Sequence, residues 1–151
     1  MVASFHYVIT ADFTDSFNQR KFKESKPPYM VFHSPFGDHY IFLRSPQGLV
    51  NQSEELETMV KVVLLKGVKA GNVQVHAHNN YVMGHSYAET VDRWQEVLEQ
   101  LEINNLKLSP KKTACFPDKL DLLGWTKEGK FLIPDPHRQN TLLTTAKPNT
   151  I

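Results

Sequence analysis

The chain has 151 residues, of which 40% are hydrophobic and 11% aromatic, which is enough for one buried core and too little for two. Its 17 Lys and Arg residues nearly balance 16 Asp and Glu residues, and the net charge of +1 excludes the strong basic excess of a dedicated nucleic-acid-binding protein. The one cysteine, Cys115, excludes an internal disulfide framework and a cysteine-based zinc finger. With no long apolar run and no signal-peptide pattern, we expect an intracellular protein of the cytoplasm or nucleus.

Hydrophobic periodicity predicts a sheet with two main helices. Apolar and β-branched runs bounded by Pro, Gly or Asn mark strands and hairpins, and apolar residues at three- and four-residue spacing mark helices. The expected strands are 5–9, 29–32, 39–43, 73–77, 81–85, 106–108, 114–116, 120–125 and 130–133. The expected helices are a short helix or turn at 14–22, then 51–66, 88–103 and a last segment opened by 134–136. Helices packed on an antiparallel sheet make an α+β sandwich.

Turn residues add expectations about where these elements end. Gly67 and Gly71 are expected to close the helix over 51–66. Because Asn tolerates positive φ values, a two-residue turn is expected at Asn79-Asn80. Trp94 on its helix face and Trp125 at a strand end are expected in the core.

Four sequence blocks occur in an order and spacing that point to a known family. They are Ala-Asp-Phe-Thr-Asp-Ser-Phe at 11–17, Ser-Pro-Gln-Gly-Leu at 45–49, Asn-Asn-Leu-Lys-Leu-Ser-Pro-Lys-Lys at 104–112 and Leu-Leu-Gly-Trp at 122–125. Together they resemble the reverse transcriptase of LTR retrotransposons. The Leu-Gly-Trp strand, the following Gly turn and Asp-Pro-His at 135–137 are most similar to BEL/Pao-type elements. The resemblance runs from about residue 5 to the end of the chain.

The resemblance implies a reverse-transcriptase palm, a ferredoxin-like antiparallel sheet with helices on one face. We expect 1–151 to form a single such domain, with the fingers, the full thumb and the RNase H region absent. The family hairpin that reads Tyr-x-Asp-Asp corresponds to Ala77-His78-Asn79-Asn80 here. Asp12 is then the one carboxylate left of three family positions, unless Asp15 swings in as a second one.

Loss of those carboxylates predicts loss of catalysis. Two-metal nucleotidyl transfer needs closely spaced carboxylates, and a neutral Asn carbonyl supplies a dipole without charge to a hard cation such as Mg²⁺. We therefore expect no active catalytic residue, no metal, no cofactor and no enzyme activity, with Asp12, Asn79 and Asn80 as relic positions. Natural decay is favoured over an engineered double change, because other residues also depart from the family pattern: His76, Ala77, His78 and Gln52-Ser53.

A few residues are candidate relic contacts to nucleic acid. Phe17 matches the family residue that stacks under the nucleotide sugar, and Gln47 and Gly48 match the loop that approaches the template. Lys111 and Lys112 belong to a locally basic C-terminal half that also includes Lys107, Lys119, Lys127 and Lys130. A tight Gly loop needed for structure and a solvated basic surface are the alternatives.

The histidines raise a separate possibility at the second hairpin. A turn at Asn79-Asn80 would place His76, His78 and His85 on the same face, as zinc ligands would lie. Solvent-facing or core histidines are the favoured interpretation over a metal site.

Two functional classes follow for a palm without catalysis. The first is a domesticated, catalytically inactive domain that acts as a protein-interaction or scaffolding module, with another protein chain or a second copy as partner. Its expected interface, where the thumb would begin, is Phe131, Leu132, Ile133, Leu142 and Leu143. The second is an RNA- or DNA-binding domain that uses the relic template cleft without chemistry, and near-neutral charge predicts that such binding is weak. A weak metal-dependent enzyme is a third class, and no membrane partner is expected.

Overall fold

A central antiparallel sheet organises the molecule in the computed structural model, which describes residues 5–21, 31–122, 124–129, 131–135, 140–141 and 143–145. The sheet has four strands in the order β4-β5-β1-β6. Its strands are β1 (Tyr7–Asp12), β4 (Val73–His76), β5 (Asn79–Gly84) and β6 (Ala114–Cys115). The predicted strand at 5–9 ends too early, because the ladder of β1 with β5 continues to Asp12.

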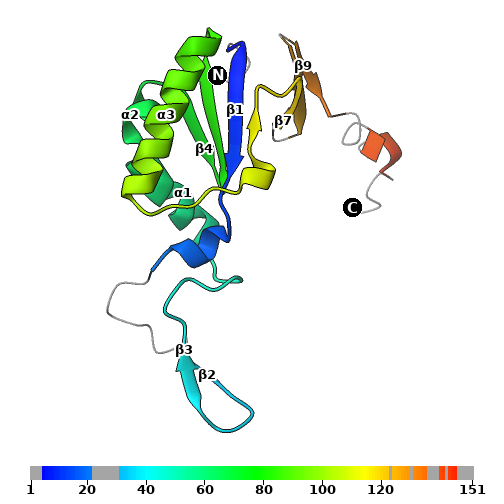
Figure 1. Cartoon of the computed structure of the whole chain (residues 1–151). Helices are drawn as coiled ribbons and strands as arrows, with labels where there is room; N and C mark the ends of the chain where they lie inside the picture. Colours follow the sequence, from blue (N-terminus) through cyan, green and yellow to red (C-terminus); the bar gives the residue numbers. More distant parts are fainter. Residues whose placement is uncertain are drawn as a thin grey trace.

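Helices cover one face of this sheet, as predicted (Figure 1). They are α1 (Gln52–Val63), α2 (Leu65–Lys69) and α3 (Tyr87–Ile103). The register pairs Ile9 with Val82 and Val82 with Val73, so side chains at these positions share the helix-facing side. All three belong to the main buried core, to which α1 contributes Leu56 and Val60 and α3 contributes Val97 and Leu101. This confirms the predicted α+β arrangement.

The predicted helix over 51–66 is in fact two helices with a break at Leu64. Gly67 lies inside α2, so the prediction that it closes the helix is wrong. A Cβ atom at Gly67 would lie 2.5 Å from Cγ2 of Val73. Glycine therefore allows α2 to approach β4 closely, and the chain turns instead at Gly71, whose φ is 74°.

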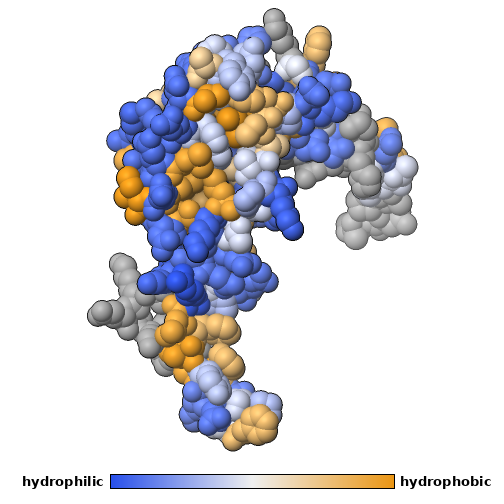
Figure 2. Space-filling model, viewed as in Figure 1, coloured by the Kyte–Doolittle hydropathy of each residue, from blue (hydrophilic) through white to orange (hydrophobic). Residues whose placement is uncertain are grey.

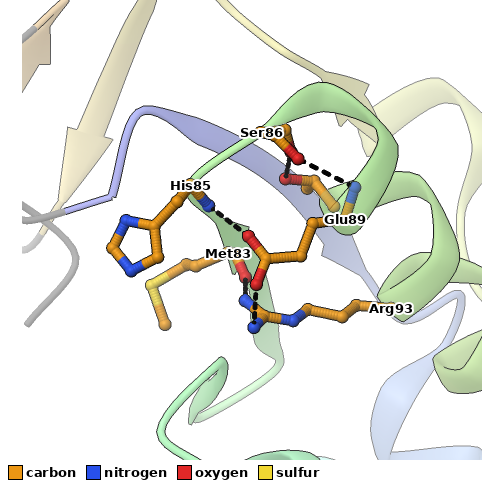
Figure 3. Close-up of polar contacts among 6 residues, drawn as sticks. Met83, His85, Ser86, Glu89 and Arg93 are labelled. Carbon is orange, nitrogen blue, oxygen red and sulfur yellow. Dashed lines mark hydrogen bonds and ion pairs between the residues drawn. The ribbon is translucent and has the colours of Figure 1, made fainter.

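A capping network joins the end of β5 to the start of α3 (Figure 3). Ser86 is the N-cap residue, and its hydroxyl accepts a hydrogen bond of 3.2 Å from the Glu89 amide. The Glu89 carboxylate accepts from the His85 amide at 2.6 Å and pairs with Arg93, which also donates to the Met83 carbonyl. The His85 amide, aided by the charge of Arg93, lowers the pKa of Glu89. These hydrogen bonds and this ion pair hold the end of β5 against the start of α3.

The hairpin between β4 and β5 turns two residues earlier than predicted. Ala77 and His78 form its tip, with φ of 51° at Ala77. Asn79 and Asn80 are instead the first residues of β5, and both are paired with β4 and with β1. The prediction of a turn at Asn79-Asn80 is wrong, because the strand ladders on both sides outweigh the local preference of Asn for turns.

A second, smaller sheet packs beside the open face of the first. It contains β7 (Lys119–Leu122), β8 (Trp125–Glu128) and β9 (Phe131–Pro134) in that order. Leu120 and Leu122 pack against a small buried cluster on the open face made of Val8, Tyr81 and Met83.

Predictions for this C-terminal region are partly wrong. The run 120–125 is split by Gly124 with φ of 90°, and the predicted strand at 106–108 is reduced to a bridge between Phe13 and Leu108. Trp94 packs against the core as predicted, whereas Trp125 is 45% exposed because it begins a strand on the small outer sheet.

A separate hairpin projects from the body of the molecule (Figure 1). It consists of β2 (Val31–His33) and β3 (His39–Ile41), as predicted. Apolar atoms gather on it (Figure 2), and Phe32 contacts the rings of Tyr40 and Phe42 at centroid distances of 5.6 and 5.0 Å.

Short helical segments complete the described part of the chain. The predicted helix or turn at 14–22 is the 3-10 helix η2 (Ser16–Gln19), and a second 3-10 helix, η4, spans Pro110–Lys112. Residues 140–141 and 143–144 are helical, in the predicted final segment. No helix among the described residues has the length and apolar content needed to cross a membrane.

Candidate functional site

The first relic position, Asp12, lies where β1 ends beside the β4–β5 hairpin. Asp12 is paired with Asn79 across the antiparallel ladder, so their side chains are on the same face of the sheet. This is the face that α1 and α3 leave uncovered. The Asp12 side chain is only 12% exposed. The structure therefore brings two of the three predicted relic positions together.

Lys112 occupies the space on the solvent side of Asp12. Its Nζ lies 3.1 Å from Oδ2 of Asp12. The pair is set up by the backbone, because the Ser109 amide donates to the Asp12 carbonyl at 2.8 Å and the Lys112 amide donates to the Ser109 carbonyl at 3.1 Å. Nε2 of His78 lies 3.9 Å from the same Asp12 oxygen. Asp12 is thus bordered by two nitrogen-bearing side chains.

Asn80 lies apart from this corner although it follows Asn79 directly. It pairs with Ala11 and Val75, and strand alternation directs it to the helix-covered face. It is fully buried, with 0% exposure, and neither atom of its amide group has a hydrogen-bond partner among the described residues.

The donor set at this corner does not fit the two divalent ions that a reverse-transcriptase palm would hold. One carboxylate is available, and a lysine ammonium already neutralises it. Asn79 carries no charge, and Asn80 faces the core. Within the described ranges, no group of three or more His, Cys, Asp or Glu side chains is placed to hold a metal ion.

The three histidines of the hairpin region each have a different nearest neighbour. His78 lies near Asp12, His76 lies 3.9 Å from Glu57, and the His85 ring lies 4.7 Å from the Phe5 ring. His76 pairs with Asn79, so strand alternation places it on the open face although the turn is formed by Ala77 and His78. The three histidines nevertheless have different neighbours and do not form one site.

Glu57 of α1 holds the hairpin tip in place. Its carboxylate accepts a hydrogen bond from the Ala77 amide at 2.7 Å and pairs with Lys61 at 2.6 Å. The hydrogen bond from Lys61 and then that from Ala77 lower the pKa of Glu57. No motif marks this residue, although its acidic side chain four residues before Lys61 is a helix-pair signal.

A buried side chain from the start of α1 holds the predicted template loop through hydrogen bonds. Gln52 is buried and donates to the Ser45 hydroxyl and the Pro46 carbonyl, both at 2.6 Å. Gln47 and Gly48 are exposed on this loop, and Gly48 has a φ of 94°. The departure of Gln52 from the family pattern therefore serves the structure of the loop.

The remaining candidate nucleic-acid residues have different surroundings. Phe17 packs against the core from η2, whereas Lys111 is exposed beside Lys112. Two lysines of the predicted basic half do not add free positive charge: Lys127 is only 6% exposed and Lys119 pairs with Glu128 at 3.3 Å. Lys130 lies outside the described residues.

Four of the five predicted interface residues lie among the described residues, on an exposed sheet edge and in the last helical segment. β9 is the outermost strand of its sheet, with Phe131 73%, Leu132 41% and Ile133 44% exposed. Leu143 is 83% exposed, and Leu142 lies outside the described residues. Their exposure makes them available for contact with another polypeptide.

No protein-family model matches the sequence, and no curated protein matches it. Solved structures do match. The foamy viral protease-reverse transcriptase dRH in complex with double-stranded DNA is 19% identical, with a TM-score of 0.78 over 95% of this chain and 25% of that chain. The same enzyme with an RNA/DNA hybrid is 19% identical, with a TM-score of 0.73 over 95% of this chain and 19% of that one. A prototype foamy virus protease-reverse transcriptase mutant is 25% identical, with a TM-score of 0.72 over 88% and 18%.

These similarities give the chain a reverse-transcriptase-like fold. The chain spans a quarter or less of the length of those foamy virus proteins. The assignment to BEL/Pao-type elements and the single-domain organisation stay predictions.

Proposed function

We propose that this chain is a reverse-transcriptase-like domain that does not polymerise nucleic acid and acts by binding another polypeptide. The observation that carries the loss of catalysis is the ion pair of Asp12 with Lys112, 3.1 Å apart, opposite the uncharged Asn79. A divalent cation would have to displace the ammonium and would then find one carboxylate instead of several. This arrangement supports the proposed absence of polymerase activity.

Primer extension tests the catalytic part of the proposal. The full chain is incubated with a primed RNA or DNA template, deoxynucleotides and either Mg²⁺ or Mn²⁺, and the products are separated by length. We expect no extension. A double variant, Asn79→Asp with Asn80→Asp, tests whether carboxylates alone restore activity. Extension by the unmodified chain that disappears in Asp12→Ala would overturn the proposal.

The exposed β9 edge supports the binding part of the proposal. Among the described residues, β9 has a neighbouring strand on one side only. Its consecutive large apolar side chains and the backbone groups of its outer edge can therefore contact a partner. Burial of such a surface contributes roughly 25 cal/mol per Å² before the costs of association. We propose that the partner is a protein or a second copy of this chain.

A second candidate function is binding of RNA or DNA without chemistry. Two of the similar foamy virus structures are complexes with double-stranded DNA and with an RNA/DNA hybrid. Lys111 and Lys112 are exposed in this chain, and Lys112 lies at Asp12 on the open face of the sheet. These two observations favour nucleic acid over other non-protein ligands.

A further inference from the structure

At the corner around Asp12, the positively charged side chain lies closer to solvent than the negatively charged one. The Asp12 side chain is 12% exposed, whereas the side chains of Lys112 and His78 above it are 65% and 43% exposed. A solute that approaches from solvent therefore meets an ammonium and an imidazole before it meets the carboxylate. The positive end of the Asp12–Lys112 pair therefore faces solvent, and this orientation favours an anion over a divalent cation.

From this arrangement we infer that Lys112 takes the place of a metal ion and binds a phosphate group directly at the hairpin tip. The inference rests on the second candidate function and names its ligand chemistry. An ammonium has three N–H donors, and one of them is directed to Asp12. The others remain for phosphate oxygens, while Asp12 holds the side chain in position.

The backbone makes Lys112 more than a mobile surface lysine. η4 is tied to the end of β1 through Asp12, and the Thr113 hydroxyl donates to the Ser109 carbonyl at 2.9 Å. The position of the Lys112 backbone is thus fixed relative to the sheet. Lys111 is exposed next to it, and Asn79 adds an amide that can donate to a phosphate oxygen.

The inference predicts that replacing Asp12 affects phosphate binding in the opposite direction from that expected of a metal site. If the site held a metal, Asp12 would be its ligand and its removal would abolish binding. If Lys112 binds the phosphate, Asp12 competes with that phosphate for the ammonium. An Asn side chain at this position can still accept a hydrogen bond from Lys112 and hold it in place, so Asp12→Asn removes only the competing negative charge and strengthens binding.

Fluorescence anisotropy tests the inference. A labelled RNA/DNA hybrid is titrated with the full chain at fixed ionic strength, once with Mg²⁺ and once with EDTA. We expect the same Kd in both buffers. Lys112→Ala should weaken binding about fivefold or more and reduce the slope of log Kd against log salt by about one. Asp12→Asn should tighten binding about threefold.

A matched control is Lys66→Ala, which changes an 85% exposed lysine on the helix-covered side and should leave the Kd unchanged. Circular dichroism checks that every variant is folded. Pyrophosphate as a competitor distinguishes the two sources of phosphate: displacement at equal phosphate concentration assigns free polyphosphate, and resistance assigns the polynucleotide backbone.

Absence of binding, a requirement for Mg²⁺, or loss of binding in Asp12→Asn would overturn the inference. So would equal effects of Lys112→Ala and Lys66→Ala. Absence of binding by the unmodified chain would refute the second candidate function itself. Binding that Lys112→Ala leaves unchanged would refute only the phosphate site at Lys112.

Discussion

A single oxygen atom, Oδ2 of Asp12, receives both close nitrogen contacts at the candidate site, from Lys112 at 3.1 Å and from His78 at 3.9 Å. A carboxylate that is 12% exposed loses most of its hydration, and a paired ammonium offsets that loss. The same pair that stabilises Asp12 in a partly buried place also occupies the carboxylate oxygen that a metal ion would use. At the residue scale, the proposed loss of catalysis and the stability of Asp12 therefore rest on the same contact.

Asn80 gives a prediction at the same scale. Its buried amide has no hydrogen-bond partner among the described residues, which costs free energy relative to an apolar side chain. We expect Asn80→Val to raise the free energy of unfolding by about 1 kcal/mol, measured by urea denaturation. Asn79→Val in the same strand controls for strand propensity and should change it by less than about 0.5 kcal/mol. A less stable Asn80→Val would indicate an internal partner for the amide.

At the element scale, α1 and the β4–β5 hairpin are connected by Glu57. Its carboxylate joins Lys61 on its own helix to the Ala77 amide at the hairpin tip. The tip carries His78 on one side and leads into Asn79 on the other, so this link positions the corner around Asp12. The helix layer thereby influences the open face of the sheet.

The lowered pKa of Glu57 predicts a pH dependence of stability. Because its folded-state pKa is below the ordinary value of 4.5, its contribution is complete above that value and is lost as pH falls through the folded-state pKa. We expect Glu57→Gln to destabilise the protein at neutral pH, and the difference from the unmodified chain to shrink in acid. Urea unfolding of both proteins, at pH values from neutral to below 4.5, measures this difference in stability. Glu54→Gln, on the exposed first turn of α1, is the control, and an equal loss at all pH values would contradict the prediction.

At the scale of the whole molecule, two apolar surfaces lie away from the main core. One is the projecting β2–β3 hairpin (Figure 2), and the other is the β9 edge. The core itself lies between the sheet and its helices. Substitutions on either surface therefore have little reason to affect folding.

The β9 edge carries the prediction about association. Leu132→Asp should weaken association with a protein partner or a second copy by about tenfold or more, since it places a charge in a strand edge that the partner covers. Sedimentation velocity over a range of concentrations measures self-association, and pull-down with nuclease treatment identifies protein partners. Val50→Asp, at an 88% exposed loop position, should have no effect. A monomer that binds no protein, with unchanged behaviour in Leu132→Asp, would contradict the prediction.

The sequence by itself determined the antiparallel sheet, the helices on one face of it and the proximity of two of the candidate site residues. Periodicity predicted an antiparallel sheet with helices on one face, and the order of four blocks predicted a reverse-transcriptase-like fold with Asp12 and Asn79 as neighbours. These features depend on local pattern and on spacing along the chain. The break at Leu64 and the turn at Gly124 were missed because both depend on how neighbouring elements pack.

Only the tertiary structure decided the chemistry of the corner. The turn falls at Ala77-His78 because β5 is held by ladders on both sides, and this separates Asn80 from Asn79. Lys112 reaches Asp12 from 100 residues away in the chain, through a backbone link that no local propensity encodes. Such contacts depend on the register between strands that are far apart in the sequence. The pairing of the Asp12 and Lys112 charges depends on these contacts.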